Sequence, residues 1–169
     1  MDARLMTPNA RNPLPATDPV AQIDVTVYVY RIEDEEAPQA HGNTASGQYI
    51  VLLDKDVVHV EAAGISTNIV YRLSPDTVAR GFAFTGAFAN DPRFQLNGPY
   101  LQSSGAGSAD PGEPQVQDTL CYVHSNTHAS LISLSLQFSD TQQPRKRVAY
   151  DPQVTNSPGD NSAGRFVVA

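Results

Sequence analysis

The sequence predicts an all-β protein: an antiparallel immunoglobulin-like β-sandwich of about eight or nine short strands. Three observations lead to this prediction. Apolar and polar residues alternate with a period of two in several short runs, turn-forming residues separate the runs, and no run has the periodicity of an amphipathic helix. A jelly roll is the alternative architecture. The chain has one Cys and no Trp, which excludes an antibody-type domain with its Cys-Trp-Cys core.

The chain of 169 residues is long enough for one domain with a substantial core. Residues 1–21 contain four prolines and are expected to form a Pro-rich flexible arm, and residues 22–169 a single β-sandwich domain. The first residues include no apolar run of the kind that forms a signal peptide or a membrane span. Together with the lone Cys121, this predicts a cytoplasmic protein without an internal disulfide.

The first strand is predicted at residues 22–32, where Val25, Val27 and Val29 point to one face and alternate with polar or aromatic residues. An acidic loop follows. The next strands are expected at 48–54, 57–62 and 67–74, the last of them ending at Ser74-Pro75.

A single helical turn is expected at 76–80, before a strand at 81–89 whose Phe82, Phe84 and Phe88 would share one face. The segment 90–114 is predicted to be irregular, with at most one short strand around Phe94. Loops of this length are usually functional or mobile. The remaining strands are expected at 115–124, 129–139, 146–152 and, as a final edge strand, 165–169.

Asp-Pro pairs mark the predicted strand ends. Asp can hydrogen-bond to its own backbone two residues on, while Pro fixes φ and has no N–H to donate to a ladder. Asp151-Pro152 is therefore expected to stop the strand that contains Tyr150, with Asn156 and Pro158 holding the next loop against the sandwich. The other pairs are Asp18-Pro19, Asp91-Pro92 and Asp110-Pro111, with Glu113-Pro114 beside the third.

The motifs DPGEP (residues 110–114) and YDPQVTNSP (residues 150–158) resemble the DP-EP family, a prokaryotic domain of unknown function. The architecture is also distantly similar to the AidA/PixA inclusion-body proteins, although the aromatic-rich ending of that family is reduced here to Tyr150-Asp151-Pro152. The likeness extends over roughly residues 22–158. It implies a β-sandwich of unassigned function, and it implies no catalytic residues.

The charge balance limits the partners. A formal net charge of −7 makes duplex nucleic acid a poor ligand. The basic run Arg145-Lys146-Arg147 is too short for a nucleic-acid footprint and is interpreted as a gatekeeper before an apolar strand. No cofactor is expected.

The candidate reactive groups are few. His124 and His128 flank a turn and are weak metal candidates, because no third ligand accompanies them. Cys121 is three residues from His124, and this odd spacing would place the two side chains on opposite faces of a strand. A buried inert thiol is the favoured interpretation, and catalysis would require Asp118 to converge with the two histidines.

Two functions follow from these residues. The first is a non-enzymatic sandwich that self-associates or binds a protein partner, in which strand edges at residues 22–30 or 165–169 could pair across a two-fold axis. The alternative is a module that binds a carbohydrate or another small ligand through Tyr28, Tyr30 and Tyr100, because flat aromatic rings stack on sugars.

Overall fold

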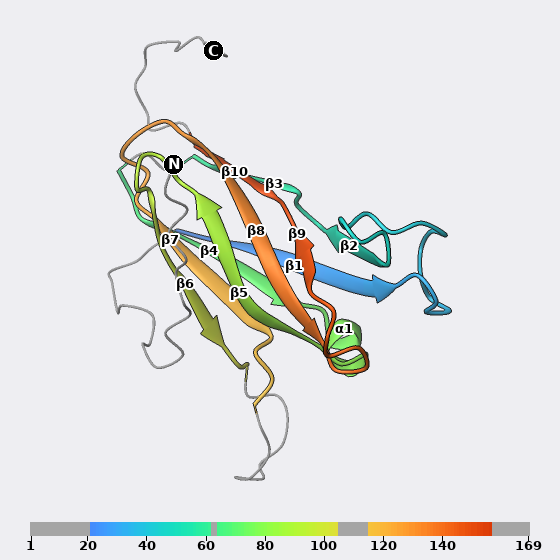
Figure 1. The fold of residues 1–169 in the computed structure, drawn as a ribbon. Helices are drawn as coiled ribbons and strands as arrows, with labels where there is room; N and C mark the ends of the chain where they lie inside the picture. The colour runs from blue at the N-terminus through green and yellow to red at the C-terminus, as the bar shows by residue number, and fades with distance from the viewer. Residues whose placement is uncertain (1–20, 62–63, 105–114, 157–169) are drawn as a thin grey trace.

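The computed structural model describes residues 21–61, 64–104 and 115–156. These residues form two sheets that pack face to face, and the ribbon shows them as two layers (Figure 1). The protein is therefore mostly β, as predicted. The expected arm at 1–21, apart from Ala21, and the expected strand at 165–169 lie outside the described residues.

The first sheet, sheet A, has the strand order β2-β1-β4-β7-β6. From Val25 onward its longest strand, β1, alternates between buried and half-buried residues, which is the pattern that predicted it. Its strands are β1 (Ala21–Arg31), β2 (Tyr49–Leu53), β4 (Thr67–Leu73), β6 (Leu96–Gln102) and β7 (Thr119–His124).

The second sheet, sheet B, has the order β3-β10-β8-β5, and β9 also pairs with β8. It is organised around β8, whose even-numbered residues are buried and whose odd-numbered residues face outward. Its strands are β3 (Val57–Val60), β5 (Phe82–Asn90), β8 (Leu131–Asp140), β9 (Val148–Tyr150) and β10 (Gln153–Asn156).

The sheets are mixed, so the prediction of a purely antiparallel sandwich is wrong. β1 runs parallel to β4, with Ala21 opposite Thr67, and β3 runs parallel to β10, with Val57 opposite Gln153. These are pairings between strands far apart in the sequence, and local alternation carries no information about strand direction. β1 also lies between β2 and β4, so it is an interior strand and not the edge that we expected to be free.

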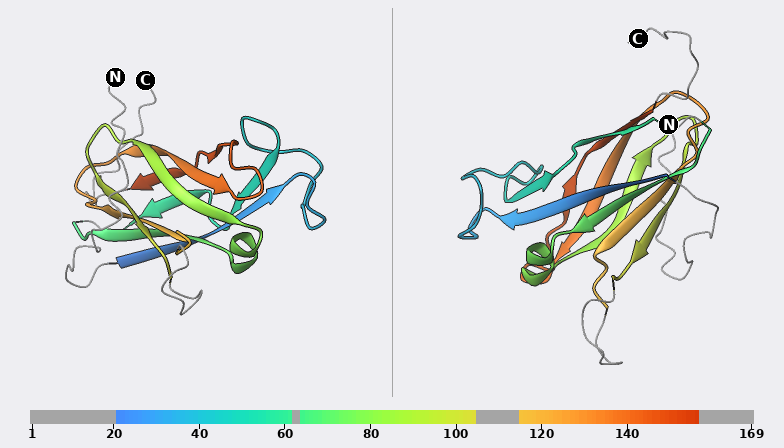
Figure 2. Two further views of the ribbon diagram at one scale, coloured as in Figure 1. Left: turned by 60° about the horizontal axis from the view of Figure 1, so that its bottom comes forward. Right: turned by 180° about the vertical axis from the view of Figure 1, so that it is seen from behind.

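The core lies between the sheets and takes side chains from both. Sheet A contributes Val27, Ile69 and Tyr122, and sheet B contributes Leu134 and Phe138, each of them at most 2% exposed. Figure 2 shows the same two layers from two further directions. Burial of this apolar surface is the main stabilising term of the fold.

The strand β5 contains a bulge that overturns one prediction. Phe84 lies opposite Phe138, but the register shifts before Gly86, so an extra residue enters β5. Because one inserted residue reverses the parity of every later side chain, Phe88 points outward and is 37% exposed, whereas Phe82 and Phe84 are buried. The three phenylalanines do not share a face.

The Asp151-Pro152 pair interrupts a strand but does not end its pairing. β9 stops at Tyr150, and β10 resumes at Gln153 along the same neighbour, β8. The carbonyl of Pro152 itself accepts a hydrogen bond from Leu134 N–H at 3.0 Å. The prediction that this pair stops the Tyr150 strand is therefore confirmed. Pairing with β8 nevertheless resumes directly after it, because Pro keeps its acceptor even though it lacks a donor.

Strand β6 lies in the segment predicted to be irregular with at most one short strand around Phe94, and it begins just after that residue, at Leu96. It carries a bulge between Asn97 and Tyr100 and includes Gly98 and Pro99, which are poor strand formers. The short helix α1 (Pro75–Ala79) is confirmed, and the Ser74 hydroxyl caps it by accepting a hydrogen bond from Thr77 N–H at 3.2 Å. Within the described ranges, no helix is long and apolar enough to cross a membrane.

Candidate functional site

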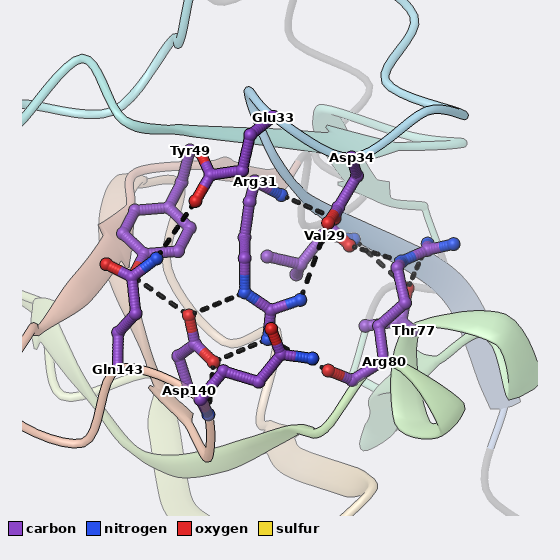
Figure 3. Close-up of polar contacts among 10 residues, drawn as sticks. Val29, Arg31, Glu33, Asp34, Tyr49, Thr77, Arg80, Asp140 and Gln143 are labelled. Carbon is purple, nitrogen blue, oxygen red and sulfur yellow. Dashed lines mark hydrogen bonds and ion pairs between the residues drawn. The ribbon is translucent and has the colours of Figure 1, made fainter.

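A buried ion pair joins the two sheets at one end of the sandwich. Arg31 ends β1 in sheet A and Asp140 ends β8 in sheet B (Figure 3). Arg31 Nε donates to Asp140 Oδ2 at 2.9 Å, and Arg31 Nη2 donates to the other carboxylate oxygen. The two side chains are 3% and 0% exposed, so the pair is a bidentate contact shielded from water.

The surroundings of this pair satisfy its remaining polar atoms. The Tyr49 hydroxyl donates to Asp140 at 3.0 Å, Arg31 Nη2 also donates to the Arg80 carbonyl at 2.9 Å, and the Arg31 guanidinium lies over the Phe82 ring. The hydrogen bond to Asp140 raises the pKa of Arg31 against the effect of burial. Although burial favours the protonated acid, the hydrogen bonds from Arg31 and other donors lower the pKa of Asp140.

The Arg31 cluster, which consists of Arg31, Asp140, Tyr49, Phe82 and the Arg80 carbonyl, is thus a buried contact between the two sheets. Burial and the bond to Asp140 raise the pKa of Tyr49 to about 12, so its hydroxyl stays protonated at neutral pH. The sequence carried a signal for this cluster that we did not use. Arg31 follows Val29 and Asp140 follows Phe138 at even spacing, and two residues along a strand lead to the same buried face.

A second polar cluster closes the opposite end. His124 ends β7, is fully buried, and accepts a hydrogen bond from Asn126 N–H on its Nδ1 at 2.9 Å. Asn156 of β10 donates from Nδ2 to Asn126 Oδ1 at 2.6 Å and accepts from Ser130 N–H at 2.8 Å. This His124 cluster links the loop after β7 to sheet B. Asn156 was expected to hold the loop that follows Asp151-Pro152, but it lies in β10 and holds the loop after β7 instead, and Pro158 lies outside the described residues.

The two candidate metal histidines face different environments. His124 points into the interior, whereas His128 is exposed, and its Nδ1 contacts the Thr127 hydroxyl at 3.0 Å. Burial lowers the pKa of His124, with the Asp91 carboxylate acting in the opposite direction. Within residues 21–61, 64–104 and 115–156, no group of three or more side chains is placed to hold a metal ion.

The other reactive groups are also separated or buried. Cys121 lies on the outer side of β7 while His124 lies on the inner side, and burial raises the pKa of the Cys121 thiol to about 11. Asp118 precedes β7, at the other end of the strand from His124, and accepts two hydrogen bonds from Ser104. Burial also raises the pKa of the hydroxyls of Tyr71 and Tyr122 in the core, so neither is a base at neutral pH.

The three predicted ligand-binding tyrosines project from the outer face of sheet A but do not converge. Tyr28 and Tyr30 lie on β1, and the guanidinium of Arg80 stacks 4.2 Å from the Tyr30 ring centroid. Tyr100 lies on β6, opposite Cys121. The order β1-β4-β7-β6 separates it from β1 by three strand spacings, or roughly 14 Å.

The most unusual surface is the outer face of sheet B. It is the set of strand residues that point away from the core on β3, β5, β8, β9 and β10, and none of those described is charged. The exposed Asp151 lies in the break between β9 and β10. The face consists of Val57, His59, Ala83, Phe88, Asn90, Leu131, Ser133, Ser135, Gln137, Ser139, Ala149, Gln153 and Thr155.

Sheet A differs from sheet B in this respect. Its outer face carries Asp24 and Arg72, which form a solvent-exposed ion pair with Nε and Oδ1 3.4 Å apart. Exposed ion pairs of this kind contribute little to stability and are typical of a solvated surface. The outer face of sheet B is therefore the candidate functional site.

No family model matches the chain, and no curated protein matches it either.

Proposed function

We propose that the protein is a non-enzymatic β-sandwich that self-associates by docking the outer face of sheet B on the same face of a second copy. The observation that carries the proposal is the absence of charge from the strand positions of this face in a chain whose net charge is −7. A surface without charges can be buried without leaving an ion unpaired. Depletion of charged residues is also the compositional signal of interface cores.

The size of the face suits a stable contact. The strands β3, β5, β8, β9 and β10 have 4, 9, 10, 3 and 4 residues. At a rise of about 3.4 Å per residue and a strand spacing of about 4.8 Å, they cover roughly 490 Å² of flat area per copy. This is more than half of the ~800 Å² of accessible surface that each partner contributes to a standard interface.

The side chains on the face support close approach. Ser133, Ser135 and Ser139 place small hydroxyls along the outer side of β8, and Gln137 between them donates to the Ser135 hydroxyl at 3.0 Å. Most of this row is therefore low enough for a second sheet to come near. Leu131 and Val57 are 56% and 54% exposed and supply apolar area toward the edges. A two-fold axis through this row would match each hydroxyl with its counterpart or with a bridging water.

Ser135→Asp tests the proposal, because it places two carboxylates opposite each other at the centre of a two-fold contact. Sedimentation velocity over a concentration series should show a monomer–dimer equilibrium whose dissociation constant rises at least about tenfold in the variant. Asn68→Asp, which adds the same charge to the outer face of sheet A, is the matched control and should leave the equilibrium unchanged. A strict monomer at every concentration, or a dimer indifferent to Ser135→Asp, would refute the proposal.

The second candidate function is the binding of a carbohydrate or another small ligand on the outer face of sheet A. Tyr28 supports it, because its ring is only half-buried on that face. A thermal-shift screen against a glycan panel tests it, with Tyr28→Ala as the variant that should lose any shift. Tyr30 and Tyr100 keep their predicted supporting role in this candidate.

The proposal also covers the family, the type of sandwich and the cellular location. We place the chain in the DP-EP family, as an immunoglobulin-like sandwich located in the cytoplasm. Its function then requires no cofactor and no contact with nucleic acid or membrane. The motif around Tyr150-Asp151-Pro152 and Asn156 supports the family assignment, and both flanks of that motif pair with β8.

A further inference from the structure

The turn between β5 and β6 presents a phenylalanine to solvent. Phe94 is 83% exposed, more than any other large apolar side chain in the described part of the chain. Its backbone has φ of 52°, in the left-handed region that bulky residues avoid. The position combines an unfavourable backbone with an unburied apolar ring, so Phe contributes nothing there to the stability of the fold.

The left-handed conformation is imposed by a dense hydrogen-bond network on both sides of Phe94. Before it, the Asp91 carbonyl accepts from Phe94 N–H at 3.2 Å, and the Asp91 carboxylate accepts from Leu96 N–H at 2.7 Å. After it, Gln95 is only 3% exposed, and its Oε1 accepts from the N–H groups of Thr127 at 2.8 Å and His128 at 3.0 Å.

The network makes the turn rigid, and rigidity matters for recognition. Backbone strain persists only where the surrounding structure over-determines it, and such positions cluster at binding sites. A side chain already held in its bound position loses little entropy on binding. Exposed aromatic residues on rigid supports are the usual anchors of protein interfaces.

The neighbours of Phe94 indicate the chemistry of what it binds. Arg93 is exposed, and its guanidinium forms no ion pair within the described residues. Ile65, 49% exposed, lies on a loop whose Gly64 N–H donates to the Asn126 carbonyl, next to the residues that Gln95 holds. The end of the molecule therefore offers an apolar ring, a second apolar side chain and a free positive charge.

We propose that the Phe94 turn is a docking site for a partner protein whose surface has an apolar pocket flanked by carboxylates. The pocket would take the Phe94 ring, and the carboxylates would pair with Arg93, which is the charge complementarity that selects this partner. This site lies on a loop and not on the outer face of sheet B, so it does not depend on the proposed self-association.

The test uses a displayed library of random peptides, selected on the full chain and depleted on Phe94→Asn, because Asn accepts left-handed φ while lacking the ring. Enriched peptides should combine Asp or Glu with apolar residues. A synthetic consensus peptide should bind the unmodified chain at least about tenfold more tightly than Phe94→Asn, and Arg93→Gln should weaken it severalfold. Val116→Asn, which removes another exposed apolar side chain outside both proposed sites, should leave binding unchanged.

The stability of Phe94→Asn is the second readout. Because the substitution relieves the left-handed strain, the melting temperature should rise by roughly 2 °C. A fall would mean that Phe94 has a structural role, and the proposal would be overturned. It would also be overturned if no peptide distinguished Phe94→Asn from the unmodified chain, or if Val116→Asn lost binding equally.

The two proposals fail separately. Ser135→Asp should weaken the dimer and leave peptide binding intact, while Phe94→Asn should do the reverse. If Phe94→Asn abolished the dimer, the Phe94 turn would be a contact between copies, and the proposal of a distinct partner would be refuted.

Discussion

His124 is the residue at which protonation and structure are most directly linked. Its Nδ1 accepts a hydrogen bond from Asn126 N–H, so the ring proton of the neutral form is on Nε2. A protonated imidazole has N–H groups at both positions, and it would oppose Asn126 N–H with a second donor. The chain from Asn126 to Asn156 that joins the loop to sheet B therefore requires neutral His124.

The first prediction at this scale concerns acid stability. The folded-state pKa of His124 lies below its unfolded value of about 6.5, so the unfolded chain binds more protons. The contribution of His124 is complete above that value and is lost as the pH falls through 6.5 toward the folded pKa. Urea unfolding should give a lower free energy of unfolding at about pH 5.5 than at 7.5, by up to about 1.4 kcal/mol.

Variants separate His124 from other titrating groups. His124→Asn retains an acceptor near the Nδ1 position but cannot be protonated, so its free energy of unfolding should fall less between the two pH values. His128→Asn, at an exposed position, should keep the slope of the unmodified chain. Equal slopes in the unmodified chain and His124→Asn would contradict this account. Asp140, whose pKa is lowered, loses its contribution at more acidic pH.

At the scale of the element, the free edge of β2 shows how this sheet avoids unwanted pairing. Asn43 lies beside that edge, where its Nδ2 donates to the Val51 carbonyl and its Oδ1 accepts from Val51 N–H, both at 2.7 Å. The side-chain amide thus occupies backbone groups that another strand would use. Gly42 allows the loop to approach, because a Cβ there would lie 2.4 Å from Gly47 backbone atoms.

Asn43→Ala should therefore destabilise the chain and expose this edge. The loss of two partly buried hydrogen bonds predicts a decrease of about 1–2 kcal/mol in the free energy of unfolding, measured in urea. Thioflavin fluorescence should also rise faster during incubation, because unpaired strand edges template aggregation. Asn97→Ala removes an exposed Asn on the β6 edge and is the matched control. An unchanged unfolding curve for Asn43→Ala would show that the loop is dispensable.

The strands that could be predicted are those whose alternation is uninterrupted. β1 and β8 each place apolar residues at every second position up to the terminal Arg31 and Asp140, and both were found close to the expected bounds. β6 could not be found in this way because Gly98 and Pro99 break its pattern. The bulge in β5 was hidden as well, since an inserted residue reverses parity without leaving a sequence signal.

For the molecule as a whole, the sequence did not predict which strands distant along the chain would pair. The parallel pairs β1–β4 and β3–β10 depend on which strands meet, and that is decided by packing of the complete core. The candidate functional site could not be predicted for the same reason. The serines of β8 were visible as an outward row, but their neighbours on β5 and β10 became known only with the sheet order.

Net charge gives the prediction that belongs to the whole molecule. Two copies of a chain with net charge −7 repel each other at long range, while the proposed interface has no ion pairs for salt to weaken. Self-association should therefore strengthen when sodium chloride is raised from about 0.05 to 0.5 M, as measured by light scattering at fixed protein concentration. Weakening with salt would mean that ion pairs hold the copies together and that another surface is used.

The order of strands in sheet B has a consequence for synthesis on the ribosome. β3 leaves the exit tunnel early, yet among the described strands its neighbour is β10, the last of them along the chain. Until Gln153–Asn156 emerge, the apolar side chains of Val58 and Val60 have no strand beside them. Sheet B therefore stays incomplete during most of translation, because β3 lacks its neighbouring strand. A chain truncated at the Asp151-Pro152 break would lack β10 permanently, and β3 would remain unpaired.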